Sequence, residues 1–325
     1  MRSWKSSAAI LVATTWLVLV ALASSASAAD TIVAGSLGGQ APLWPFYVAM
    51  QKGIFADEGI TLDLNFAPSG ASVVQQLTAG SIEAVVSVGL TEPLEAIDKG
   101  APIAIIRIIG RSAPYVLIAK PTIKSIKDLR GKTISIGPLP DIITIYFERM
   151  MAANGLKKGD YDVISAGVAA ARFAALRAGA ADAAMVLPPL NFHAAEQDYP
   201  TIGLAADYVK DLPFTGMVVY KTWAASHRAL VQRLLDATTK SIAWLDDPAH
   251  RQEAIDLLVK SAHARPKDAA ASYDFLRRIG YFEPTGKVSR KLLGNMIAAD
   301  QKRGNVGAAL TVDRVTMPGL TPLTD

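Results

Sequence analysis

The chain has 325 residues, 51% of them hydrophobic, and a formal net charge of +4 at pH 7. It contains no cysteine, so its stability depends on a buried core rather than on disulfides, which is feasible at this length. The small net charge gives no indication of a nucleic-acid partner or of binding to an anionic membrane surface.

The first 28 residues have the pattern of a secretory signal peptide. Arg2 and Lys5 precede an uncharged apolar run at 8–23, and the sequence ASA at 26–28 offers a small-residue cleavage site. The run is shorter than the roughly 20 residues that span a membrane, which disfavours an uncleaved anchor. We expect cleavage near Ala28 and a periplasmic protein without a lipid-attachment cysteine. Loss of this segment would lower the net charge from +4 to +2.

Residues 29–112 alternate short apolar strands with helices. Strands are expected at 31–34, 60–66, 84–88 and 103–109. The helix over 46–52 ends at Gly53, a residue suited to the left-handed conformation that closes helices. In segment 60–66 the apolar residues alternate strictly, so Ile60, Leu62, Leu64 and Phe66 are expected on one face.

A second unit, after the sequence YVLIAKP at 115–121, repeats the scheme. A strand at 133–136, a helix at 142–153 and strands at 161–165 and 181–186 are expected, and residues 226–303 read as almost wholly helical. This alternation predicts an α/β fold with mostly parallel sheets covered by helices. Two such units predict two lobes with a cleft between them, where ligand sites are commonly found.

No pattern of catalytic or metal-binding residues is found. The four histidines, at 193, 227, 250 and 263, include no pair four residues apart, and there is no cysteine to complete a metal site. The chain has no serine-nucleophile elbow, no P-loop and no dinucleotide fingerprint. We therefore expect no enzyme, no cofactor and no metal.

Three segments carry a resemblance to a known family. They are PLWPFYVAMQKGIFADEGITLDL (42–64), SIKDLRGKTISIG (125–137) and AARFAALRAGAADAAMVLPP (170–189), which occur in the family's order. The resemblance as a whole extends over nearly all of the mature chain. The chain thus resembles the solute-binding proteins of ABC transporters in the nitrate/sulfonate/taurine family.

The resemblance implies a type II periplasmic-binding fold that closes around a solute and delivers it to a membrane permease. The first lobe would comprise 29–112 and the returning, largely helical 217–325, with the second lobe at 113–216. The crossings between the lobes are expected near 110–116 and 214–219, where a few residues change their backbone angles on closure. A monomer is expected.

Candidate ligand-binding residues lie where strands end and helices begin at the expected cleft. They are Leu43, Trp44, Ser69, Gly70, Ser72, Gly89, Thr91, Arg111, Leu139, Asp141, Pro188, Asn191, Phe214 and Thr215. Several have a structural alternative: Ser69, Ser72 or Thr91 as a helix cap, and Trp44 or Phe214 as a core aromatic residue. Arg111 is the favoured cation for a carboxylate, with a solvated loop arginine as its alternative.

The segment GPLPDIIT (137–144) indicates the kind of solute. Pro138 and Pro140 lack the N–H groups that an anion would use, and Asp141 is expected to cap the following helix. Leu139, Trp44 and Phe214 would then form an apolar wall together with the prolines at 188 and 189. This pattern favours an aromatic or heterocyclic solute over nitrate or a small alkanesulfonate, with Ser69–Ser72 or Arg111 meeting any carboxylate. The alternative is a rigid connection outside the cleft.

Two other functions remain open. A pyrimidine-making enzyme of thiamine synthesis resembles the same family, but that enzyme class uses histidine and a cysteine-rich segment, and this chain has no cysteine. A periplasmic sensor subunit that signals to a membrane kinase is the other alternative.

Overall fold

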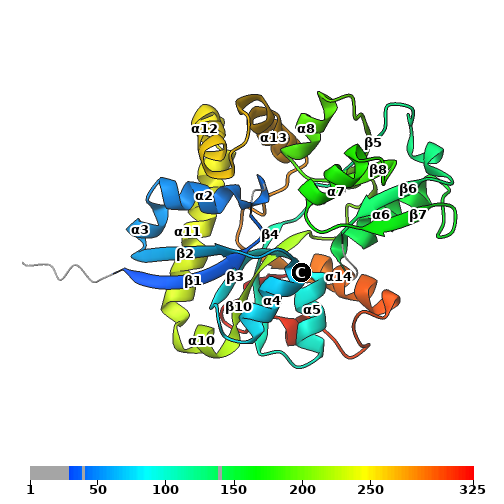
Figure 1. Cartoon of the computed structure of the whole chain (residues 1–325). Coiled ribbons are helices and arrows are strands. Elements are labelled where there is room, and N and C mark those ends of the chain that lie inside the picture. Colours follow the sequence, from blue (N-terminus) through cyan, green and yellow to red (C-terminus); the bar gives the residue numbers. More distant parts are fainter. Residues whose placement is uncertain (1–28, 39–40, 138–140) are drawn as a thin grey trace, which may run out of the picture.

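The computed structural model describes residues 29–38, 41–137 and 141–325 (Figure 1). The expected signal peptide and the loop 138–140, with Leu139, therefore lie outside the described residues. Within them the chain forms two five-stranded sheets, each flanked by helices.

The first sheet has the strand order β2-β1-β3-β10-β4. Its strands are β1 (Asp30–Ser36), β2 (Ile60–Phe66), β3 (Ala84–Gly89), β4 (Ile103–Gly110) and β10 (Thr215–Tyr220). The strands β2, β1 and β3 are parallel, whereas β10 is antiparallel to both β3 and β4.

The second sheet repeats this plan in the order β7-β6-β8-β5-β9. Its strands are β5 (Val116–Ala119), β6 (Thr133–Ile136), β7 (Asp162–Ser165), β8 (Ala183–Val186) and β9 (Thr201–Leu204). The strands β7, β6 and β8 are parallel, and β5 is antiparallel to β8 and β9. Each sheet is thus mixed, because a strand next to a crossing, β5 or β10, runs against its neighbours.

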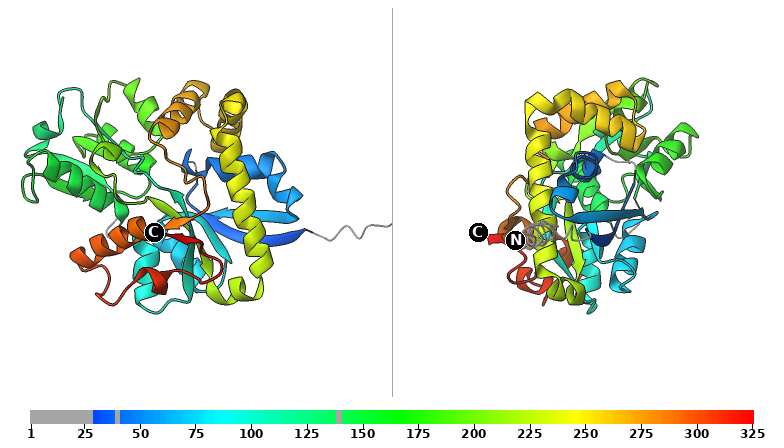
Figure 2. Two further views of the ribbon diagram at one scale, coloured as in Figure 1. Left: turned by 180° about the vertical axis from the view of Figure 1, so that it is seen from behind. Right: turned by 90° about the vertical axis from the view of Figure 1, so that its left-hand side faces the viewer.

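Helices cover both sheets, and the long helix α11 runs along the first one beside α2 and α3 (Figure 2). The helices near the cleft are α2 (Trp44–Gln51), α4 (Gly70–Thr78), α5 (Thr91–Asp98), α6 (Ile142–Ala153), α7 (Ala169–Arg177) and α8 (Leu190–Ala195). The others are α3 (Ile54–Asp57), α9 (Ala205–Tyr208), α10 (Lys221–Ser226), α11 (Arg228–Asp246), α12 (Arg251–Ala262), α13 (Pro266–Arg278), α14 (Arg290–Arg303) and α15 (Val312–Val315). Three 3-10 turns (Ala41–Leu43, Ile126–Leu129, Pro248–His250) and the short strands β11 (Val288–Ser289) and β12 (Leu323–Thr324) complete the elements. No helix of the described part has the length and apolar character to cross a membrane.

The two sheets are joined where the chain crosses between them. The strand β4 ends at Gly110 and β5 begins at Val116, and the chain returns to the first sheet at Thr215. The backbone N–H of Phe214 donates to the carbonyl of Gly110 over 2.7 Å, so the two crossings lie side by side. The second crossing was expected near 214–219, but residues 215–219 already belong to β10. The crossing therefore ends where β10 begins, at Thr215. The lobe boundaries themselves remain a prediction.

Burial decreases along β2. Ile60 and Leu62 are buried, whereas Phe66, which the alternation places on the same face, is 55% exposed. Since β2 is an edge strand, its last residues extend beyond the core.

Candidate functional site

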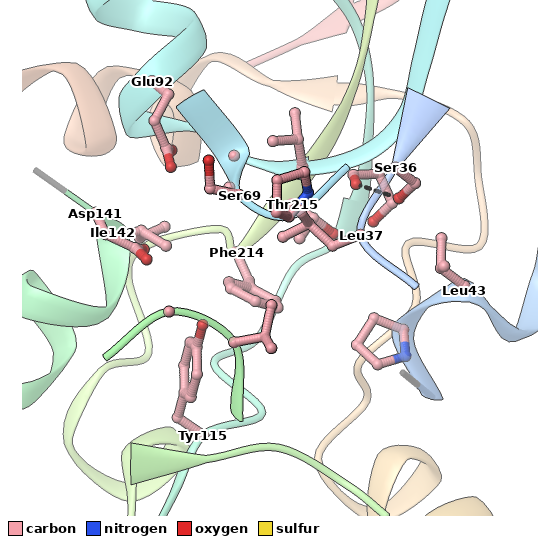
Figure 3. A pocket seen from close by; sticks show the side chains of 18 of the residues that line it. Ser36, Leu37, Leu43, Ser69, Glu92, Tyr115, Asp141, Ile142, Phe214 and Thr215 are labelled. Carbon is pink, nitrogen blue, oxygen red and sulfur yellow. Dashed lines mark hydrogen bonds between the residues drawn. The ribbon is translucent and has the colours of Figure 1, made fainter. Parts of the chain in front are cut away.

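A pocket lies between the two sheets, and residues from both line it (Figure 3). The first sheet contributes the ends of β1 and β3 and the starts of α4 and α5. The second contributes the starts of α6 and α7, and the crossings contribute Tyr115, Phe214 and Thr215. Open α/β sheets bind ligands at the carboxyl ends of their parallel strands, and both sheets present those ends here.

The pocket is small but adjoins a larger hollow. Its free volume is about 60 Å³, and the neighbouring hollow, which shares Val168 with it, has about 380 Å³. Because a cavity of about 150 Å³ holds benzene, a ring-sized solute needs either this extension or some separation of the sheets.

Two helices that begin at the pocket, α4 and α6, are each capped by the side chain of the residue directly before them. The Ser69 hydroxyl accepts a hydrogen bond from the backbone N–H of Ser72 (3.2 Å) at the start of α4. The Asp141 carboxylate accepts one from the N–H of Ile143 (3.0 Å) at the start of α6. Asp141 therefore caps α6, as the sequence predicts. Neither capped N–H is free for an anionic solute.

Two carboxylates enter the pocket from opposite sheets, Glu92 on α5 and Asp141 before α6 (Figure 3). Burial raises the pKa of Glu92 well above its usual range, and the charge of Asp141 raises it further. Burial also raises the pKa of Asp141, against the lowering effects of the Ile143 N–H and of Arg172.

Arg172, in the first turn of α7, is the cation of the described pocket lining. Its Nε donates to the carbonyl of Met185 (2.6 Å) and its Nη1 to the carbonyl of Gly167, and its guanidinium lies 5.8 Å from the centre of the Tyr115 ring. Arg172 is thus largely occupied in holding the start of α7 against the second sheet.

Aromatic rings form one wall of the pocket at the crossings. Tyr115 and Phe214 pack edge to face with ring centres 5.2 Å apart, and Tyr146 and Tyr281 lie behind them. The Tyr281 hydroxyl is within hydrogen-bonding distance of Thr215 Oγ1 (3.2 Å), and the Tyr146 hydroxyl donates to the carbonyl of Pro213 (2.7 Å). These bonds hold the aromatic wall at the point where the sheets are joined.

The structure brings seven of the predicted site residues together in this pocket. They are Leu43, Ser69, Gly70, Gly89, Asp141, Phe214 and Thr215. All lie at strand ends, helix starts or the crossings, which was the basis on which they were predicted.

Six predicted residues lie elsewhere. The Trp44 ring is only 1% exposed, donates from Nε1 to the carbonyl of Ala254 (2.8 Å) and belongs to the core. Thr91 is buried in the first turn of α5, where its hydroxyl contacts Asp300 (3.4 Å). Ser72 uses its N–H for the α4 cap and is not among the lining residues.

Arg111 is exposed near the crossings and donates from Nε to the carbonyl of Gly280 (2.9 Å), away from the pocket lining. Pro188 lines the neighbouring hollow, and its carbonyl accepts from the N–H of Ala41 (3.4 Å), a contact between the two sides of the cleft. Asn191 is buried in α8 and lines neither cavity.

Sequence reasoning missed Glu92, Tyr115 and Arg172. Glu92 follows the predicted strand 84–88 at a helix start, so the strand-end rule that selected Gly89 and Thr91 could have found it. Tyr115 lies inside the predicted crossing at 110–116 but was named only as the first residue of the segment YVLIAKP. Arg172 lies in an alanine-rich helix, and nothing in that pattern marks its position as facing the cleft.

Within the described residues, no group of three or more histidine, aspartate or glutamate side chains is arranged to hold a metal ion.

A protein-family model described as NMT1/THI5 like matches residues 40–251. Among curated proteins, the chain is similar to the riboflavin-binding protein RibY of Chloroflexus aurantiacus, with 27% identity over 223 residues, which are 66% of this chain. The match spans 61% of the length of that relative.

Solved structures share the fold. The alkanesulfonate-binding protein SsuA from Xanthomonas axonopodis pv. citri, bound to MOPS, aligns with a TM-score of 0.73 and 16% identity over 90% of this chain and 98% of that one. The periplasmic nitrate-binding protein NrtA from Synechocystis PCC 6803 aligns with a TM-score of 0.70 and 16% identity over 89% and 86%. The fold predicted from the resemblance is thereby confirmed.

Proposed function

The chain belongs to the NMT1/THI5-like family, and on that premise we propose that it is the solute-binding component of an ABC importer. The observation that carries this proposal is the pocket between the two sheets, which is lined from both sides and closed at the crossings by Phe214 and Thr215. A solute in this position contacts both lobes, so its binding free energy favours their closure.

The solute that we propose is a small organic molecule with a flat or partly apolar portion. The edge-to-face pair of Tyr115 and Phe214 offers an aromatic surface, and the adjoining hollow extends the space along Pro188. The similarity to a riboflavin-binding protein supports an organic solute with a ring system. A flat solute of this kind suits a pocket with an aromatic wall.

The structure gives less support for a carboxylate on the solute than for a ring system. Its expected partners were Arg111 and the Ser69–Ser72 segment, but Arg111 lies away from the pocket lining and the N–H of Ser72 is already bonded to Ser69. Nitrate and small alkanesulfonates are also less well served, because one N–H group at the start of α4 and one at the start of α6 are already bonded to a capping side chain.

We further propose an exported, periplasmic monomer that delivers its solute to a permease in the inner membrane and does not convert it chemically. Export is supported by the signal-peptide pattern of residues 1–28, and delivery by the fold shared with periplasmic binding proteins. Mass spectrometry of solute recovered after long incubation with the protein should return it unchanged, and a converted product would favour the enzyme alternative.

Thermal-shift screening of the purified protein tests the proposal. Nitrate, taurine and MOPS form one group of compounds, and riboflavin with aromatic and heterocyclic acids forms the other. We expect a concentration-dependent rise in melting temperature with a member of the second group, since a ligand that binds only the folded state stabilises it. Stabilisation by nitrate or taurine alone would contradict the proposed solute class, and no stabilisation by any compound would contradict solute binding itself.

A further inference from the structure

Glu92 has an unsatisfied oxygen that is directed into the pocket. The Oε2 atom is inaccessible to solvent and has no hydrogen-bond partner among the described residues. A buried carboxyl oxygen without a hydrogen-bond partner is costly in either protonation state. The close-up shows this side chain pointing into the space between Ser69 and Asp141 (Figure 3).

Two glycines make room for the carboxylates of Glu92 and Asp141. A Cβ atom at Gly70 would come within 2.9 Å of the Glu92 Cδ atom, and one at Gly137 would come within 2.6 Å of Asp141 Oδ2. Any other residue at these positions would force a neighbouring side chain, such as the carboxyl group, to shift. Glycine therefore permits the placement of acceptor oxygens on both sides of the pocket.

Arg172 does not neutralise the pair. Two of its guanidinium nitrogens donate to the backbone carbonyls of Met185 and Gly167. Asp141 has a donor in the N–H of Ile143, and Glu92 Oε2 is left without one. Glu92 and Asp141 thus bring acceptor oxygens into the pocket, whereas a nitrate or sulfonate requires donors.

We propose that Glu92 and Asp141 form a subsite for the hydrogen-bearing nitrogen of the solute, either a cationic amidine or amine or the neutral N–H of an amide or heterocycle. This inference deepens the proposed function and rests on it. When the two sheets separate enough to admit the solute, its hydrogen-bearing nitrogen donates to the Glu92 carboxyl group and to the free lone pairs of Asp141. A flat group next to this nitrogen packs on Tyr115 and Phe214. The solute thereby contacts one carboxylate from each lobe, so donor groups also favour closure.

Three probes of nearly equal shape test this assignment: benzamidine, benzamide and benzoate. They differ in presenting a cationic N–H group, a neutral N–H group and a carboxylate. Dissociation constants are measured for each at neutral pH by ligand-observed NMR, with protein purified after expression of the full chain. We expect benzamidine or benzamide, or both, to bind at least about tenfold more tightly than benzoate, because benzoate adds a third carboxylate to the pocket. If benzamidine binds more tightly than benzamide, the subsite prefers a cationic N–H group; the reverse order indicates a neutral one.

Variants assign the effect to the carboxylates. Glu92→Gln should weaken binding of the preferred N–H probe about tenfold or more and bring benzoate closer to it. Asp141→Asn should act in the same direction, while its side-chain oxygen still accepts from the N–H of Ile143 and preserves the cap of α6. Glu95→Gln is the control, since Glu95 lies on the same helix outside the pocket lining, 3.9 Å from Lys99. It should change binding by less than twofold.

The assignment is contradicted if benzoate binds as well as the N–H probes, if none of the three probes binds, or if Glu92→Gln has no more effect than Glu95→Gln. These results would leave the proposed function intact, provided that the thermal-shift screen still finds a stabilising solute. If no compound in that screen stabilised the protein either, the result would contradict the proposed function as well.

Discussion

The ring of Tyr281 occupies the space next to Gly110 at the point where the two sheets are joined. A Cβ atom at residue 110 would come within 2.5 Å of Tyr281 Cζ, and Tyr281 is fully buried, so its ring has little room to move away. The same ring packs against Phe214, and its hydroxyl contacts Thr215, both of which line the pocket. Packing at the crossing is therefore coupled to the wall of the proposed solute site.

Substitution of Gly110 by alanine should destabilise the protein. Overpacking of a well-filled site costs about 1–3 kcal/mol, and we expect a loss of that order in the free energy of unfolding from urea denaturation. Gly294→Ala is the matched control, because residue 294 is inside helix α14 and only Val312, at 3.9 Å, is near the added Cβ atom. The control should be neutral or stabilising by up to about 1 kcal/mol. Equal effects of the two variants would show that Tyr281 does not restrict residue 110.

Asp300 should make stability depend on pH. It lies in α14 with no exposed surface, and burial raises its pKa from 3.8 to about 6, against hydrogen bonds from Asn305 and Thr91. Because the folded value is the higher one, the fold favours the protonated form. This stabilisation is complete below pH 3.8 and is lost as the pH rises through 6. Of the nearby charges, that of Glu95 raises the pKa of Asp300 and that of Arg303 lowers it. The charge of Asp300 in turn raises the pKa of Glu92.

The variant Asp300→Asn tests this dependence. A rise of about two in pKa corresponds to roughly 3 kcal/mol at most. The free energy of unfolding of the variant, relative to that of the native protein, should therefore be higher at pH 8 than at pH 4 by up to that amount. Thermal or urea unfolding at both pH values measures it. Asp313→Asn removes an exposed partner of Arg290 and should change stability by no more than about 1 kcal/mol at either pH. A gain for Asp300→Asn that is equal at both pH values would show that its ionisation does not cause the effect.

Much of the fold follows from local signals in the sequence. The strand at 133–136 and the helix at 142–153 were predicted with the bounds that the structure shows, because an apolar strand, a glycine and a capping aspartate occur in succession. The direction in which each strand runs was harder to predict from the sequence. The strands β5 and β10 run against their neighbours because the chain has just crossed between sheets, and no local pattern encodes that direction.

The candidate site was predictable only in part for the same reason. Ser69, Gly89 and Asp141 lie at strand ends or helix starts, and such positions can be read from the sequence. Whether a side chain there faces the cleft or the core depends on packing against distant segments. Trp44 shows this, since its ring is held by the carbonyl of Ala254, which is 210 residues away in the chain. Arg111 was selected because it follows an apolar strand near a predicted crossing, and Arg172 was not among the candidates.

The exported protein should begin at Ala29. Residues 1–28 combine an apolar run with the small-residue sequence ASA, a pattern that is typical of segments removed during export. N-terminal sequencing of protein from the periplasm of a bacterial host measures the start directly. A protein that still begins at Met1 would contradict cleavage and favour the uncleaved anchor.

Binding of a solute should make the protein more compact. A solute in the proposed pocket would contact both sheets. Within the described residues the chain crosses between the sheets at 110–116 and near 214, so a few residues permit a hinge motion. Small-angle X-ray scattering should show a smaller radius of gyration with the strongest stabilising compound at saturation. The same radius with and without that compound would contradict closure but not binding.

The position of the solute site is the central claim, and two tryptophan substitutions test it most directly. Val168 lines the pocket and is 38% exposed, whereas Val163, on strand β7, is 41% exposed and outside both cavities. Isothermal titration with the strongest stabilising compound should show at least a tenfold weaker affinity for Val168→Trp, because the indole fills the space that the solute needs. Val163→Trp should bind as the native protein does. Native affinity in Val168→Trp, or an equal loss in both variants, would contradict a solute site between the two sheets.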